Sequence, residues 1–181
     1  MTAQIPDRYR WQGQDYAFVA ASAPLDFVPE ENGFRPVMVS TACWRGYVCS
    51  YEIAEDTLFL RRLEIRCQED DYPPFDGVLP VREGRGRAVY ENLRHRMDYT
   101  GSILLGADFL DDYYVHMGIQ RAWAYQRVHE LVFEHGRLVR TADHCQAVEA
   151  IRRRMEEDPD GFFGSPGDGA VLGRDFHAWW I

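Results

Sequence analysis

The sequence predicts an α+β fold, in which a mostly antiparallel sheet of about six or more strands is followed by one C-terminal helix. Three observations support this prediction. Short apolar runs bounded by turn residues recur from residue 15 to residue 141. A Gly-containing turn, His135-Gly136, joins two of these runs. A helical repeat of apolar residues stands out in residues 143–158.

The early strands are predicted from apolar runs between loops that contain Pro and Gly. Residues 15–22 (DYAFVAAS) are expected to form the first strand, and residues 36–44 (PVMVSTACW) a buried one. Residues 45–65 are expected to form a hairpin that turns at Glu55-Asp56. The expected pairs are Ile53 with Leu58, Tyr51 with Leu60, Cys49 with Arg62, and Tyr47 with Glu64. This register places Arg62 and Glu64 at the far end of a face that is otherwise apolar.

The later helices and strands are predicted from the spacing of apolar residues and turn residues. Val89, Leu93 and Met97 recur every fourth residue and predict a short helix. Residues 99–110 are expected to form a strand, and residues 128–141 a hairpin around His135-Gly136. The C-terminal helix is expected to be capped by Asp143 and to bury a stripe of apolar residues. That stripe comprises Ala147, Ile151 and Met155. The chain ends in FHAWWI, which is expected to pack back onto the domain.

Length and charge limit the classes of function. The 181 residues are expected to form a single domain, residues 1–181. The 29 acidic residues outnumber the 20 basic ones, giving a formal net charge of −9. This charge argues against binding to nucleic acid, which attracts basic surfaces, and it favours a basic protein as partner.

Sequence features also bear on the cellular location of the protein and on metal and cofactor binding. No apolar run is long enough for a membrane span, and the N-terminus lacks the apolar core of a signal peptide. A cytoplasmic location with four reduced cysteines is therefore expected. The cysteines show no CxxC spacing, so no metal site is predicted. The segment GSPGDGAVLG lacks the Lys-Ser/Thr of a phosphate-binding loop, and no cofactor is predicted.

One candidate catalytic site lies in DDYYVHMGIQRAW. If this segment is extended, Asp112, Tyr114 and His116 share a face. His116 would then be a general acid or base oriented by Asp112, with Tyr114 as proton donor, and Arg62 or Arg121 would hold an anionic substrate. The alternatives are a structural histidine and a partial metal ligand set.

A second candidate is a binding surface at Trp44, Arg45 and Tyr47, because Trp, Tyr and Arg are enriched at the energetic centres of interfaces. Two alternatives remain open. The aromatic rings could belong to the core with Arg45 lying over them, or a small-molecule pocket could form on the face of Tyr47 and Tyr51.

Four blocks of the sequence carry a resemblance: STACWRGYVCSYEI, LFLRRLEI, YTGSILL and YYVHMG. They resemble an uncharacterised family of small bacterial proteins, over roughly residues 36–140. In that family a Trp-Arg-Gly-Tyr segment precedes a strand ending in an acidic residue and Ile, and a Tyr-x-His segment follows later. The resemblance implies a bacterial origin and one mixed domain. It assigns no activity and no catalytic residue.

These observations predict a non-enzymatic module that binds another macromolecule. One concrete form is an immunity-like protein whose acidic surface covers a basic toxin site, with Trp44, Arg45 and Tyr47 as anchors. The alternative is a hydrolase or phosphodiesterase that acts on a small anionic substrate through His116, Asp112 and Tyr114.

Overall fold

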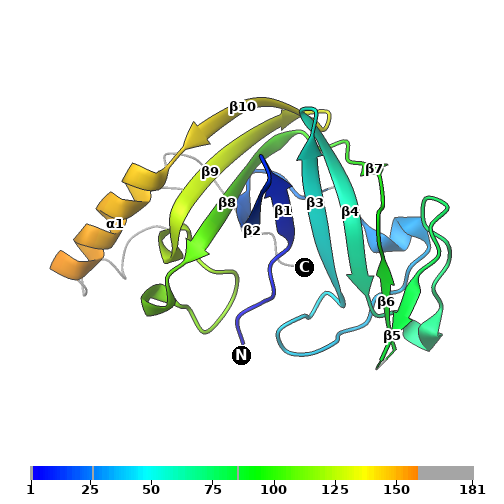
Figure 1. The fold of residues 1–181 in the computed structure, drawn as a ribbon. Coiled ribbons are helices and arrows are strands. Elements are labelled where there is room, and N and C mark those ends of the chain that lie inside the picture. The colour runs from blue at the N-terminus through cyan, green and yellow to red at the C-terminus, as the bar shows by residue number, and fades with distance from the viewer. Residues whose placement is uncertain (1, 26, 85, 159–181) are drawn as a thin grey trace.

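The computed structural model describes residues 2–25, 27–84 and 86–158 of the chain (Figure 1). Within these residues ten strands form one largely antiparallel sheet, and one α-helix follows it, so the predicted α+β class is confirmed. The strands are β1 (Arg8–Trp11), β2 (Gln14–Ala21), β3 (Tyr47–Ala54), β4 (Thr57–Ile65), β5 (Val81–Glu83), β6 (Arg87–Tyr90), β7 (His95–Arg96), β8 (Gly101–Phe109), β9 (Tyr125–Glu134) and β10 (Arg137–Asp143). The helix is α1 (Cys145–Glu157), and four short 3-10 turns, η1 (Pro29–Asn32), η2 (Gln68–Asp70), η3 (Asp111–Tyr113) and η4 (Ala122–Ala124), lie in the loops.

The sheet curves until its strands meet again. The order runs β10-β9-β8-β2-β1-β3-β4, and β10 pairs with β4 at Arg137 and Thr57. Two backbone hydrogen bonds reinforce this closure: Leu58 N–H donates to Gly136 O at 2.9 Å, and Leu138 N–H donates to Asp56 O at 2.7 Å. Figure 1 shows the β3–β4 hairpin meeting the β9–β10 turn at one end of the molecule. Beyond this contact the same edge of β4 pairs with β7 and then with β6.

The curved sheet has two apolar faces. The inner face is filled by a core that includes Tyr9, Phe18, Leu60 and Phe133. The outer face over β2, β8 and β9 is covered by α1 and η4, and Val148 and Ile151 of α1 are buried there in a second cluster. Figure 1 shows α1 to one side of the sheet, beside β8 and β9. Burial on both faces explains why these strands are apolar on both sides.

The cap and the buried stripe of α1 differ from the sequence prediction. It begins at Cys145 with His144 at the cap position, and Asp143 is the last residue of β10. The Asp143 carboxylate accepts the N–H of Cys145 at 2.7 Å, so it still satisfies one free backbone donor. The Arg152 guanidinium donates to the backbone oxygens of Trp123 and Tyr125, which ties the helix to the start of β9. Of the predicted stripe, Ala147 is exposed and its place is taken by Val148.

The β3–β4 hairpin forms with the predicted turn, but its register differs from the prediction. Tyr51 pairs with Leu60 as expected, whereas Cys49 pairs with Leu63 and Tyr47 with Ile65. The reason is a β-bulge at which Arg61 is an extra residue in β4. The bulge puts Leu63 and Ile65 into the core, where both are buried, in place of the predicted Arg62 and Glu64.

Two predicted elements are wrong. Residues 36–44 form a loop with isolated bridges instead of a buried strand, and Met38, Val39 and Trp44 are exposed on it. Residues 87–97 contain the short strands β6 and β7 instead of a helix, although the three apolar residues that suggest one are buried: Val89, Leu93 and Met97. Pairing with β4 overrides the local helical spacing in this segment.

Other predictions hold or are not covered by the structure. Strand β2 matches the predicted first strand, and β8 and the β9–β10 hairpin match the later ones. His135 and Gly136 have φ of 48° and 76°, as a primed hairpin turn requires. The Gly-rich segment and FHAWWI lie outside the described residues. In the described part of the chain, no helix has the length and apolar character needed to cross a bilayer.

Candidate functional site

A cavity of about 300 Å³ lies at the end of the sheet where β1 and β3 begin and β2 ends. Its walls come from the residues before β1, from β2 and the loop after it, and from the loop that leads into β3. Phe18, Leu25, Phe27 and Ile119 are among the apolar residues that line it. The volume lies at the small end of the range for ligand pockets in proteins, about 300–1,000 Å³.

A charged pair forms the polar part of the wall. Asp7 is 3% exposed, and its two oxygens accept hydrogen bonds from the Arg45 guanidinium at 2.8 and 3.1 Å. The Asp7 carboxylate also accepts the backbone N–H of Cys49 at 2.8 Å. Burial alone would lower the pKa of Arg45, but the adjacent Asp7 carboxylate outweighs it and raises that pKa. The Arg45 guanidinium therefore stays charged, and the Asp7 carboxyl group faces it within the wall.

Tyr47 and Trp44 lie beside this pair. The Arg45 guanidinium is over the ring of Tyr47, with Cζ 4.7 Å from the ring centroid, and Phe27 meets the same ring edge-on. Burial raises the pKa of Tyr47 to about 12, so its hydroxyl is protonated at neutral pH. Trp44 is 50% exposed at the cavity, and its backbone N–H donates to the side chain of Gln4 at 3.3 Å. All three residues of the predicted binding surface thus line the cavity.

The inner wall contains a buried aromatic stack. The ring centroid of Tyr9 lies 4.8 Å from that of Tyr51 and 6.4 Å from that of Phe18, and the latter two residues line the cavity. Tyr9 is 1% exposed, and its hydroxyl has no hydrogen-bond partner among the described residues. The free-energy cost of removing this hydroxyl from water is therefore not offset by a hydrogen bond within the protein.

Replacement of Tyr9 by phenylalanine is therefore expected to leave the free energy of unfolding unchanged or to raise it by up to about 1 kcal/mol. Tyr99→Phe is the matched control, because Tyr99 is also 1% exposed but its hydroxyl donates to Ser102 O at 3.1 Å. The control is expected to lower stability by about 1 kcal/mol. Urea denaturation measures both; a loss in Tyr9→Phe as large as in Tyr99→Phe would contradict the expectation.

The predicted catalytic residues lie elsewhere. The segment that carries them is not extended, because Asp111–Tyr113 forms the 3-10 turn η3 and a loop follows. Asp112, Tyr114 and His116 are exposed, and the rings of Tyr114 and His116 meet edge-on with their centroids 5.1 Å apart. The loop contributes Ile119 to the cavity, whereas these three residues do not line it.

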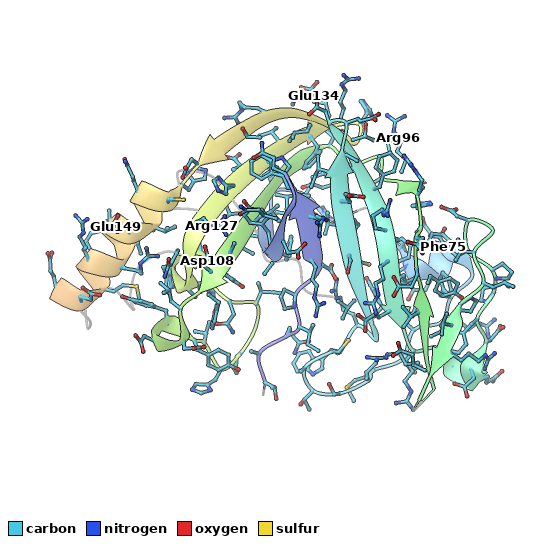
Figure 2. All side chains as sticks on the ribbon, in the orientation of Figure 1. Phe75, Arg96, Asp108, Arg127, Glu134 and Glu149 are labelled. Atoms are coloured by element: carbon cyan, nitrogen blue, oxygen red, sulfur yellow. The ribbon has the colours of Figure 1, made fainter. Side chains whose placement is uncertain are left out.

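The two predicted anion-binding arginines also lie outside the cavity lining. Arg62 belongs to a network of ion pairs with Glu64 and Glu91, at 2.6 Å to the latter, and Arg87 joins the same network. Arg121 is an exposed residue at the start of η4. The Arg127–Asp108 pair, at 2.5 Å between β9 and β8, lies near the α1 side of the molecule (Figure 2).

Within the described residues, no group of three or more His, Cys, Asp or Glu side chains is placed to hold a metal ion. The four cysteines are free thiols, and burial raises the pKa of Cys43, Cys49, Cys67 and Cys145. These thiols are therefore protonated at neutral pH and poorly nucleophilic.

Three comparisons were made: with protein-family models, with curated proteins and with solved structures. None gave a match. The resemblance to an uncharacterised bacterial family consequently stays a prediction, and the geometry of the cavity carries the functional argument.

Sequence reasoning missed several residues of this site. Asp7 and Gln4 precede β1, a strand that the sequence analysis does not predict, and Ile119 lies in a loop whose polar residues dominate its interpretation. The alternation in Arg8-Tyr9-Arg10-Trp11 is the signal that could have revealed β1, since Tyr9 and Trp11 are buried and the two arginines exposed. Recognition of β1 would have placed Asp7 at the start of a buried strand.

Proposed function

We propose that this chain is a non-enzymatic binding protein that holds a small, mainly apolar molecule in the cavity between Phe27, Arg45 and Ile119. The observation that carries the proposal is the cavity itself: about 300 Å³, walled mainly by apolar side chains, with a few polar groups at one side. Ligand pockets in proteins have this composition, in which apolar walls supply affinity and a few polar groups fix orientation.

The chemistry of the lining favours binding over catalysis. The Asp7 carboxylate already accepts three hydrogen bonds and faces Arg45, which leaves it poorly placed to take a proton from a substrate. Tyr47 and Cys43 keep their protons at neutral pH because burial raises both pKa values. The hydrolase alternative gains no support from the exposed positions of Asp112 and His116.

A second candidate is a basic protein partner that covers the mouth of the cavity, in the manner of an immunity protein. It is supported by the net charge of −9 and by the exposed apolar side chains of Met38, Val39 and Trp44 on the loop before β3. We further propose a cytoplasmic location, which is consistent with the free thiols.

The binding proposal is tested with phenylnaphthylamine, an uncharged apolar probe whose fluorescence rises in apolar surroundings. The expected result is saturable binding with one site per chain. Ile119→Trp places a larger side chain in the cavity and is expected to weaken binding at least about tenfold, which corresponds to a loss of about 1.4 kcal/mol or more. Val139→Trp is the control, because Val139 is 49% exposed on β10 and does not line the cavity.

Two results would contradict the proposal: the absence of saturable binding to the unmodified chain, or an equal loss in both tryptophan variants. Circular dichroism of each variant shows whether the fold is retained, so that a loss of binding in Ile119→Trp is not attributed to unfolding.

A further inference from the structure

We propose that the ligand of this cavity is uncharged and presents a hydrogen-bond acceptor, such as a carbonyl oxygen, to the guanidinium of Arg45. The inference rests on the proposed binding function and adds the chemical class of the ligand.

The first step is a count of the donors on Arg45. A guanidinium has five N–H groups and no acceptor. Two of them are directed to the oxygens of Asp7, one from each terminal nitrogen. The other three make no hydrogen bond to any residue that the structure describes. Because Arg45 lines the cavity with its side chain 24% exposed, these donors can be reached by a molecule inside it.

The second step concerns charge. Asp7 already compensates Arg45, so a carboxylate in the ligand would meet a paired cation and an adjacent anion. A cationic ligand would lie next to the guanidinium, which carries the same charge and would repel it. Either ion would also lose its hydration in a cavity whose walls are mainly apolar, and that loss would have no compensating partner. A neutral acceptor avoids both penalties and still gains a charge-assisted hydrogen bond.

The third step concerns the remaining polar group and the walls. Tyr47 also lines the cavity, with its ring 4.7 Å from the Arg45 Cζ, and its hydroxyl is a second possible donor for a ligand held there. Phe18, Phe27 and Ile119 form apolar walls suited to the rest of the ligand. An aromatic or short aliphatic ketone, ester or amide has this combination of groups.

The test uses four naphthalene compounds substituted at the same ring position: acetylnaphthalene, ethylnaphthalene, naphthoate and aminomethylnaphthalene. Isothermal titration calorimetry at neutral pH measures their affinities. Acetylnaphthalene is expected to bind at least about tenfold more tightly than ethylnaphthalene, the gain typical of a hydrogen bond to a charged donor. The anion and the cation are expected to bind more weakly than either neutral compound.

Two variants test the role of the Asp7–Arg45 ion pair. Arg45→Met removes the donors, and it is expected to bring acetylnaphthalene down to the affinity of ethylnaphthalene. Asp7→Asn leaves Arg45 without its counter-charge, and it is expected to reverse the preference so that naphthoate binds more tightly than acetylnaphthalene. Each variant leaves one partner of the buried pair alone, so if either does not fold, the ranking of the four compounds in the unmodified chain still decides the proposal.

The outcomes separate the two proposals. If acetylnaphthalene and ethylnaphthalene bind equally, or if naphthoate binds most tightly to the unmodified chain, the ligand class is wrong and the binding function stands. If none of the four compounds and no phenylnaphthylamine binds, the binding function itself is wrong.

Discussion

Replacement of Asp7 by alanine is expected to lower the free energy of unfolding by about 3 kcal/mol, because it leaves the partly buried Arg45 charge without its partner. The value lies at the lower end of the range for broken buried pairs, since Arg45 retains some contact with solvent. The change also removes the acceptor for the backbone N–H of Cys49. Urea denaturation of the purified variant measures the loss.

The double variant Asp7→Ala/Arg45→Met is the control for this prediction. Apolar side chains of similar size can replace a buried ion pair at little cost, whereas loss of one partner is strongly destabilising. The double variant is therefore expected to recover most of the stability that Asp7→Ala loses. A double variant as unstable as the single one would show that the carboxylate acts mainly through Cys49.

Replacement of Gly46 by alanine is expected to lower the free energy of unfolding by about 3 kcal/mol and to abolish probe binding in the cavity. Gly46 lies between Arg45 and Tyr47 and has φ of 80°, a left-handed conformation that disfavours a side chain. A Cβ at this position would lie 2.3 Å from the backbone oxygen of Val37, so the backbone on one side must move. That movement would displace two lining residues at once.

Gly77→Ala separates the cost of a left-handed backbone conformation from the cost of the steric clash. Gly77 has a similar φ of 75°, but a Cβ there would meet no atom within 4 Å. Its replacement is expected to lower stability by about 1 kcal/mol, the conformational penalty alone, and to leave probe binding unchanged. Equal losses in the two variants, measured by urea denaturation and phenylnaphthylamine titration, would rule out a steric role for Gly46.

Local patterns were sufficient to predict the parts of the fold that local chemistry determines. The His135-Gly136 turn and the apolar run of β8 are examples, since turn geometry and strand propensity act over a few residues. The β3–β4 register was not predictable in this way. Alternation without a bulge would have put Arg62 and Glu64 into the core, and only the packing of Leu63 and Ile65 favours the extra residue.

Only part of the candidate site can be predicted from the sequence, because its other contacts join residues that are far apart in the chain. Trp44, Arg45 and Tyr47 were identified from residue type and do line one cavity. Their partner Asp7 lies 38 residues away in the sequence from Arg45, and nothing local distinguishes a buried aspartate from a solvated one. The apolar run at residues 36–44 is typical of a buried strand, yet tertiary structure leaves Met38 and Val39 in solvent.

The closure of the sheet has a consequence for how the chain is made. Strand β1 needs β3 as its parallel neighbour, β2 needs β8, and β4 meets β10 only when the residues near 137 exist. A nascent chain on the ribosome therefore carries unpaired strand edges until almost all described residues have been synthesised. Such long-range pairing is expected to make folding slower than that of a helical chain of equal length, which a stopped-flow refolding experiment would measure.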